Sequence, residues 1–206
     1  LKYSQLMKRS SKSEATRQHI LDTSFPLVLQ KGFVGVGLQE ILKACDVPKG
    51  SFYHYFASKE AFGCALLEQY ITDYKNQVEQ LWQLTDGSAY ARLMALWQAW
   101  IEDPIHGGWA ENCLIVKLAA EVSDLSEDMR QILNFGVNKL TERVATLLEE
   151  GQQEGSIPAH IQPVKMAQVM YQLWLGAALL AKLAQDKAPL HLALETTHSL
   201  LQPNKD

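Results

Sequence analysis

The spacing of apolar residues is the feature that most constrains the fold of this chain. Between Glu14 and Leu201, apolar side chains recur three and four positions apart, as they do along one face of an α-helix. No stretch shows the two-residue alternation of a half-buried strand. The pattern therefore predicts an all-α protein of about nine helices without an internal repeat.

Capping and helix-breaking residues divide this pattern into separate helices. Gly32 is placed to end the first helix, and Pro26 inside it predicts a kink or a break near Ser24. Ser58 can cap the fourth helix and Asn112 the sixth. The expected helices cover about residues 14–30, 38–44, 49–56, 58–84, 90–102, 113–122, 125–154, 163–185 and 189–201.

Charge is distributed unevenly along the chain. The whole sequence has a net charge of -4 at pH 7, which by itself argues against a nucleic-acid partner. Residues 1–60, however, hold nine Lys and Arg against five Asp and Glu, a net +4, and the other 146 residues hold ten against eighteen, a net -8. This asymmetry indicates a basic N-terminal part with its own task, although chance placement of charges on solvated faces is the alternative.

The composition excludes several other classes of protein. No apolar run reaches the roughly 18 residues of a membrane span, and no apolar signal-peptide core begins the chain, so we expect a cytoplasmic protein that does not contact a membrane. The three cysteines, Cys45, Cys64 and Cys113, fit neither a disulfide framework nor a zinc site, and we expect no metal or other cofactor. Met7 is a plausible initiator, which would leave residues 1–6 outside the native protein.

Two short predicted helices joined by a tight turn lie inside the basic segment. Helices 38–44 and 49–56 have the layout of a helix-turn-helix, and Phe52 and Phe56, four positions apart, should face the core. The opposite face then carries groups whose chemistry suits DNA, on Lys49, Gly50, Ser51, Tyr53, His54 and Tyr55. A solvated aromatic helix is the alternative.

The segment Leu38–Phe62, LQEILKACDVPKGSFYHYFASKEAF, resembles the DNA-binding signature of the TetR family of bacterial repressors. The resemblance implies a three-helix DNA-binding head, a sensor body, and a homodimer formed by the last two helices. We accordingly divide the chain into a flexible N-terminal arm (residues 1–13), a helix-turn-helix domain (14–60), and a sensor and dimerisation domain (61–206). The expected partner is a double-stranded palindromic operator.

The resemblance also implies a role for individual residues of the head. It assigns Gln39, Lys49, Gly50, Ser51 and His54 to base edges, and Tyr53, Tyr55 and Lys59 to phosphates. Gly37 stands where many members of the family have a capping threonine or serine that touches phosphate, so this chain departs from the pattern there. Phosphate contacts set affinity and its salt dependence, whereas base contacts set sequence preference.

Cys113 differs from the other cysteines in its expected surroundings. It follows a glycine-containing loop and lies in the first turn of a predicted helix, where the dipole and free amides lower a thiol pKa. Lys117, four residues later, shares that face and can add positive charge. An inert buried thiol is the alternative. Cys45 and Cys64 are interpreted as packing residues.

Two further segments, Cys113–Arg130 and Leu173–Lys182, resemble one branch of the TetR family, repressors that sense reactive electrophiles and hypochlorous acid. The resemblance implies that Cys113 is the sensing thiol, that Lys182 is its partner amine, and that the targets encode detoxifying enzymes. An isolated lysine among Ala and Leu is costly unless it is paired or reaches solvent, and snorkelling of Lys182 to the surface is the alternative. A shift at Cys113 is expected to reach the head through helix 58–84.

The last helices carry two further sets of candidate residues. The first set consists of aromatic side chains that could line a ligand cavity: Trp97, Trp100, Trp109, Tyr171 and Trp174. Aromatic residues at helical spacing are more often part of a core, which is the alternative. Residues expected at a four-helix dimer interface are Gly176, Ala177, Ala178, Ala181, Leu190, Leu194, Thr197 and Leu201.

Two alternatives to the electrophile sensor remain at this point. One is a TetR-type repressor induced by a reversible small apolar ligand held among these aromatics. The other is an all-α enzyme, but the sequence has no phosphate-binding glycine loop, no HExxH and no nucleophile elbow, so we do not expect an enzyme.

Overall fold

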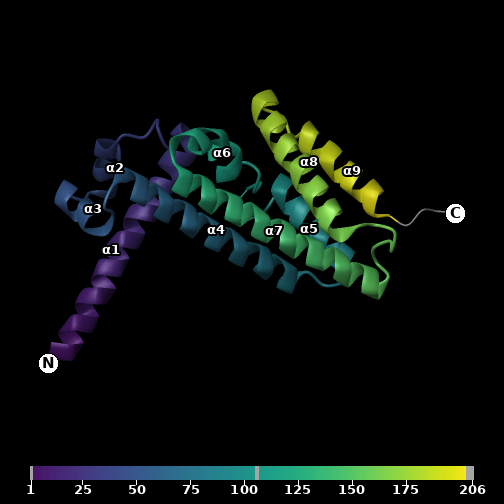
Figure 1. Cartoon of the computed structure of the whole chain (residues 1–206), viewed down its shortest axis with the longest axis horizontal. Helices are drawn as coiled ribbons and strands as arrows, with labels where there is room; N and C mark the ends of the chain where they lie inside the picture. Colours follow the sequence, from purple (N-terminus) through teal and green to yellow (C-terminus); the bar gives the residue numbers. More distant parts are fainter. Residues whose placement is uncertain (1, 105–106, 203–206) are drawn as a thin grey trace. The chain divides into compact units, whose positions relative to one another are not determined.

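The chain folds into α-helices throughout its described length. The computed structural model describes the backbone of residues 2–104 and 107–202, and the side chains of residues 13–104 and 107–202. Within these ranges there are nine helices and no strand, which confirms the all-α prediction (Figure 1). They are α1 (Lys2–Lys31), α2 (Leu38–Cys45), α3 (Lys49–Tyr55), α4 (Lys59–Leu84), α5 (Ala89–Ile101), α6 (Leu114–Leu125), α7 (Glu127–Glu154), α8 (Pro163–Ala184) and α9 (Ala188–Leu201).

The helices belong to two compact units. Unit 1 comprises Leu1–Tyr70 and Lys117–Leu133, and unit 2 comprises Ile71–Val116 and Asn134–Asp206. Unit 1 therefore extends beyond the expected boundary at residue 60, because most of α6 and the start of α7 pack with the helix-turn-helix. The sequence pattern shows only that α6 is amphipathic and contains no signal for the unit on which it packs.

The first helix is longer than expected. It begins at Lys2, so the segment 2–13 that the sequence assigned to an arm is helical, and it passes through Pro26 to Lys31. Proline removes one hydrogen bond to the carbonyl four residues earlier. Pro26 and Asp22 are both exposed, so this carbonyl faces water and the helix continues.

Local caps fix where several helices start and stop. Gly32 ends α1 as expected, with φ 82° and its N–H donating to the Val28 carbonyl at 2.8 Å. The Ser58 hydroxyl accepts from the Ala61 N–H at 2.9 Å, and Ser126 accepts from the Met129 N–H at 3.3 Å ahead of α7. Helix α6 starts at Leu114, so Cys113 directly precedes the helix instead of lying in its first turn.

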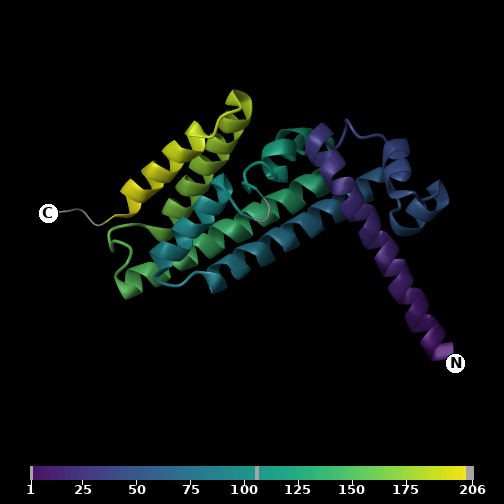
Figure 2. The same ribbon diagram turned by 180° about the vertical axis from the view of Figure 1, so that it is seen from behind.

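Each unit has its own apolar core. In unit 1 the core includes Ile20, Phe52 and Phe62, all fully buried. In unit 2, α8 and α9 run side by side in both views and pack against α5 (Figures 1 and 2). The core of unit 2 is built around Trp97 and Trp174. No helix of the described ranges is both long and apolar enough to cross a lipid bilayer.

Candidate nucleic-acid interface and sensor site

The turn of the helix-turn-helix is fixed by its backbone. Asp46, the C-cap of α2, has φ 51° and ψ 46°, and its N–H donates back to the last turn of that helix. Pro48 then holds an extended conformation, φ -69° and ψ 151°, directly before α3. The left-handed residue reverses the chain and proline is compatible with the helix start, so only three residues separate the end of α2 from the start of α3.

Helix α3 presents its polar side chains on one face. Phe52 is fully buried and packs on Phe56 and Phe62, with ring centroids 5.2 and 5.5 Å away, which confirms that Phe52 and Phe56 face the core. The opposite face exposes Lys49, Gly50, Tyr53 and His54, whereas Ser51 and Tyr55 are partly buried. The Lys49 ammonium lies 5.9 Å from the centre of the Tyr53 ring. A cation, two aromatic rings and a bare stretch of backbone thus lie together on an exposed surface.

Helix α2 and its approach add two positions to this surface. Gln39 is exposed in the first turn of α2. Gly37 is the N-cap of α2, with φ -75° and ψ 149°, and it offers no side-chain cap. A Cβ added at Gly37 or at Gly50 would meet no heavy atom within 4 Å. Neither glycine is therefore required by the packing of the described chain.

Lys59 lies in a different environment from the other predicted DNA contacts. Its ammonium donates to the Phe33 carbonyl at 2.8 Å and lies 4.7 Å from the centre of the Phe33 ring. Partial burial lowers the pKa of Lys59, and the nearby Glu121 carboxylate acts in the opposite direction. The side chain supports the turn between α1 and α2, and its contact with phosphate stays a prediction.

The cysteines occupy three different environments. Cys113 is buried at 4% exposure in the core of unit 2, next to the start of α6. Cys45 is buried against Ser24, and burial raises its pKa. Cys64 is the most exposed of the three. Its pKa is raised as well, mainly by partial burial and then by the neighbouring carboxylates, of which Asp128 has the largest effect.

Two phenols accompany Cys113 in unit 2. Burial raises the pKa of both Tyr74 and Tyr171, and an electrostatic interaction with Cys113 contributes to each rise. Trp100 Nε1 donates to the Tyr74 hydroxyl at 2.8 Å. Both phenols therefore stay protonated at neutral pH as possible hydrogen-bond donors. Tyr74 is not predicted by the sequence, because its apolar helical surroundings give no signal that distinguishes it from a core residue.

The two lysines predicted to assist Cys113 have other surroundings. The Lys117 ammonium donates to the Gln30 carbonyl at 3.0 Å, at the end of α1. Lys182 is exposed in the last turn of α8, where a cation is favoured by the helix dipole. Exposure keeps the Lys182 ammonium hydrated, so its presence in an apolar helix needs no buried partner. Its partnership with Cys113 stays a prediction.

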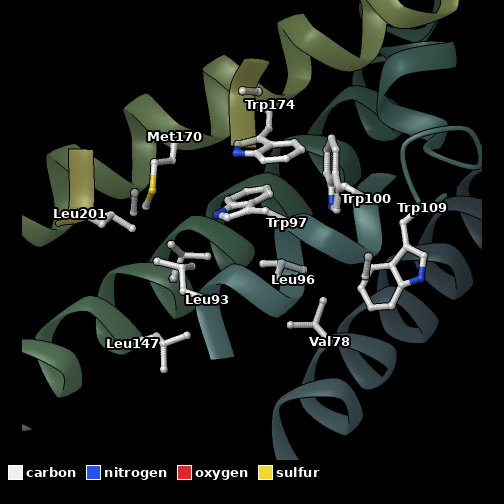
Figure 3. Packing of buried hydrophobic residues seen from close by; sticks show 14 of the residues in the cluster. Val78, Leu93, Leu96, Trp97, Trp100, Trp109, Leu147, Met170, Trp174 and Leu201 are labelled. Carbon is white, nitrogen blue, oxygen red and sulfur yellow. The ribbon is translucent and has the colours of Figure 1, made fainter. Parts of the chain in front are cut away.

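Four of the five candidate cavity residues, Trp97, Trp100, Trp109 and Trp174, lie in the core of unit 2 (Figure 3), and Tyr171 is buried as well. The rings of Trp97 and Trp174 stack at 4.8 Å and 8°, and Trp100 meets both edge-on at 5.7 and 6.1 Å. Trp174 Nε1 donates to the Thr197 hydroxyl at 2.9 Å. The indole N–H groups of Trp97 and Trp109 are buried and have no hydrogen-bond partner within the described ranges. Most of this set is therefore core, with two buried donors left over.

The predicted dimer residues divide by exposure. Ala177, Ala178, Leu190, Thr197 and Leu201 are buried within unit 2, and Ala181 and Leu194 pack partly against its core. Gly176 is exposed, and a Cβ there would meet nothing within 4 Å. Sequence periodicity does not separate the buried stripe from the exposed apolar residues that a partner could reach on α8 and α9. These are Val164, Val169, Leu179, Leu180, Leu183, Leu192 and Leu200.

These features, a helix-turn-helix unit and a separate helical unit, agree with two known protein domains. Residues 20–63 match bacterial regulatory proteins of the tetR family, and residues 89–197 match the tetracyclin repressor-like C-terminal domain. The chain belongs to the TetR family of DNA-binding transcriptional regulators.

Particular relatives narrow this assignment. The chain is 42% identical to the transcriptional repressor NemR of Escherichia coli K12 over 186 residues, which is 90% of this chain and 94% of NemR. The crystal structure of E. coli NemR in its reduced form matches with a TM-score of 0.86 over 93% of this chain and all of that one. A TetR/AcrR-family regulator of known structure is 59% identical, with a TM-score of 0.82 over 92% of this chain and all of that one. The regulator AcuR of Cereibacter sphaeroides is 36% identical over 84% of this chain and 80% of its own length.

Proposed function

We propose that this protein is a homodimeric repressor that binds a palindromic operator through α3 and releases it when an electrophile or oxidant modifies Cys113. It would act in the cytoplasm, where operator DNA lies, and would control genes for detoxifying enzymes. The observation that carries the DNA part is the exposed face of α3, with Lys49, Gly50, Tyr53 and His54 held outward by the buried Phe52.

The two recognition helices of a dimer would enter successive major grooves about 34 Å apart. Base edges would be read by Gln39, Lys49, Gly50, Ser51 and His54, and phosphates would be held by Tyr53, Tyr55 and Lys59. A base-edge substitution such as Lys49→Ala is then expected to change sequence preference, whereas loss of a phosphate contact weakens binding to all sequences.

The sensing part rests on the position of Cys113 and on the similarity to NemR. A thiol directly before a helix lies near free backbone amides that favour the thiolate. Addition of that thiolate to an electrophilic alkene forms one S–C bond as the C=C π bond breaks, and a proton adds to the other alkene carbon. Hypochlorous acid would oxidise the Cys113 thiol to a sulfenic acid, releasing chloride and a proton, and attack of the Lys182 amine on that sulfur would then form an S–N bond and release water.

Homodimer formation rests on the exposed apolar faces of α8 and α9. Leu180 and Leu183 are 56% and 73% exposed, and Leu192 is 64% exposed. Soluble monomers seldom leave such a surface uncovered, and a two-fold copy would bury both helices of each protomer. Gly176, with open space at its Cβ position, would permit close approach of the paired helices.

Operator binding with and without N-ethylmaleimide or hypochlorite tests the proposal in three proteins. The wild type and Cys64→Ser are expected to lose operator affinity on treatment, and Cys113→Ser is expected to keep it. Cys64→Ser is the matched control because it removes a more exposed thiol. Equal release of the wild type and Cys113→Ser would eliminate sensing through Cys113.

A second candidate is a repressor induced by a reversible ligand. It is favoured by the buried N–H groups of Trp97 and Trp109, which have no hydrogen-bond partner among the described residues. A buried donor without a partner is costly, and a small apolar ligand with one acceptor atom would satisfy it. Release of operator from Cys113→Ser by such a ligand, together with loss of that response in Trp97→Phe, would support this candidate over thiol chemistry.

A further inference from the structure

The turn between α1 and α2 is held by side chains from α6, which are distant in sequence. The Glu121 carboxylate accepts hydrogen bonds from two successive backbone N–H groups, those of Phe33, at 3.3 Å, and Val34. One turn earlier on α6, the Lys117 ammonium donates to the Gln30 carbonyl at 3.0 Å. An anion thus binds backbone donors and a cation binds a carbonyl at the helix end, so both contacts have complementary charge.

The neighbouring residues are fitted to these contacts. Gly32 has φ 82°, a conformation that favours glycine, and a Cβ at this position would lie 2.7 Å from Glu121 Oε2 and so would displace the carboxylate. The Phe33 peptide is held from its other side as well, because its carbonyl accepts from Lys59 on α4. The Phe33 ring is buried, and its atoms would lie 2.7 Å from a Cβ at Gly63. The turn is therefore fixed by α6 on one side and α4 on the other.

This turn leads directly into the helix-turn-helix. It ends at Gly37, and α2 begins at Leu38. At the other end, α6 is one continuous helix that begins at Leu114, the residue after Cys113. Lys117 and Glu121 lie about one and two turns beyond Cys113, so a displacement of about 1 Å at the start of a rigid helix reaches both without loss. A displacement of that size would lengthen the hydrogen bond from the Phe33 N–H, at 3.3 Å, beyond bonding distance and would weaken the shorter one from the Val34 N–H.

We propose that Glu121, supported by Lys117, is a latch that couples the state of Cys113 to the position of α2 and hence to operator binding. With Cys113 unmodified, the latch holds the turn in the DNA-binding arrangement. Modification of Cys113 shifts α6, the carboxylate loses the Phe33 amide and holds the Val34 amide less tightly, and α2 loses its fixed entry. This coupling rests on the proposed repressor function. Its route from Cys113 to α2 runs through residues of α6, and not along α4 as expected from the sequence.

Glu121→Gln and Asp124→Asn form a matched pair for its test. Each replaces one carboxylate of α6 by an amide of the same shape, but Asp124 is exposed one turn beyond the latch. The ratio of operator dissociation constants after and before modification by N-ethylmaleimide is the first readout. A coupling of usual size makes this ratio about 5- to 150-fold in the wild type. Asp124→Asn should keep the wild-type ratio and Glu121→Gln should bring it towards one. A wild-type ratio in Glu121→Gln would overturn the proposal.

Hydrogen exchange at the amides of Phe33 and Val34 is the second readout, and it does not depend on thiol sensing. Both amides should be protected in the unmodified wild type and in Asp124→Asn, and should exchange at least tenfold faster in Glu121→Gln, which should also bind operator more weakly without any modifier. Operator release by the modified wild type with these amides still protected would refute the latch. If modification of Cys113 releases no operator, the proposed sensing function is wrong. The role of Glu121 in holding α2 is then tested by the amide exchange rates and the operator affinity of unmodified Glu121→Gln alone.

Discussion

Substitution of Gly50 in α3 is expected to change the stability of the protein and its affinity for operator DNA in opposite directions. Gly50 is exposed in the helix, its φ is not positive, and a Cβ would meet no heavy atom within 4 Å. Glycine inside a helix destabilises it by about 0.5–1 kcal/mol relative to alanine. Since nothing in the described chain requires glycine at this position, Gly50→Ala is expected to stabilise the free protein by that amount. For a chain of this size the melting temperature should rise by about 1–4 °C.

The same methyl group is expected to weaken operator binding. If the backbone at Gly50 lies against base edges, a Cβ separates the two surfaces and disturbs the contacts of Lys49 and Ser51 beside it. Loss of one base contact costs about 1–3 kcal/mol per half-site, or about 5- to 150-fold in affinity. Thermal denaturation and fluorescence anisotropy with labelled operator, on the same preparation and at fixed salt, measure the two effects.

Gly176→Ala is the matched control for this pair of measurements. It makes the same change in another helix where a Cβ meets nothing within 4 Å, but on the proposed dimer face. It should change the dimer dissociation constant in sedimentation, whereas Gly50→Ala should leave that constant unchanged. Unchanged operator affinity in Gly50→Ala would refute the placement of this glycine against DNA, and a lower melting temperature would refute the stability estimate.

Three further predictions concern residues around this face and the thiols. Gly37→Ser should stabilise α2 by a few tenths of a kcal/mol by adding the missing cap, and should tighten operator binding in anisotropy if its hydroxyl also reaches phosphate. Lys59→Ala should lower the slope of log affinity against log salt by about one, because a phosphate contact is lost. It should also lower the free energy of unfolding by about 1–3 kcal/mol, because the charged hydrogen bond to the Phe33 carbonyl is lost. An unchanged slope with lower stability would show that Lys59 only supports the turn. Peptide mass spectrometry at neutral pH should find N-ethylmaleimide on Cys113 before Cys64, because the pKa of the Cys64 thiol is raised; the reverse order would show that exposure alone governs labelling.

Local patterns predicted the helices but not every boundary. The recurrence of apolar residues located nine helices, and the cap at Gly32 ended α1 where expected. Helix α1 does not break at Pro26, because the missing hydrogen bond lies on an exposed face, where the carbonyl is open to hydration. Whether a proline lies on the exposed face depends on what the helix packs against, which its own sequence does not contain.

Contacts between distant residues account for most of what the sequence analysis missed. The four-residue spacing predicts that Lys117 shares a face with Cys113, but the Lys117 ammonium donates to the carbonyl of Gln30, 87 residues away. Glu121 was not singled out at all, since an acid on an amphipathic helix is ordinarily solvated. In the same way, periodicity marked Leu190 and Leu201 as one stripe of α9 but could not show that the core of their own unit covers it.

The net positive charge of residues 1–60 is mostly cancelled when charge is counted over all of unit 1. That unit holds eleven Lys and Arg and ten Asp and Glu, because α6 and α7 add acids to the basic segment. A net charge of +1 provides little general attraction for DNA, so affinity must depend on local geometry. Glu40 pairs with Lys31, and Glu121 is bound to backbone amides, so two acids of the unit are used inside it. The exposed face of α3 thus depends on a few directed contacts, which is why a single methyl group at Gly50 is expected to matter.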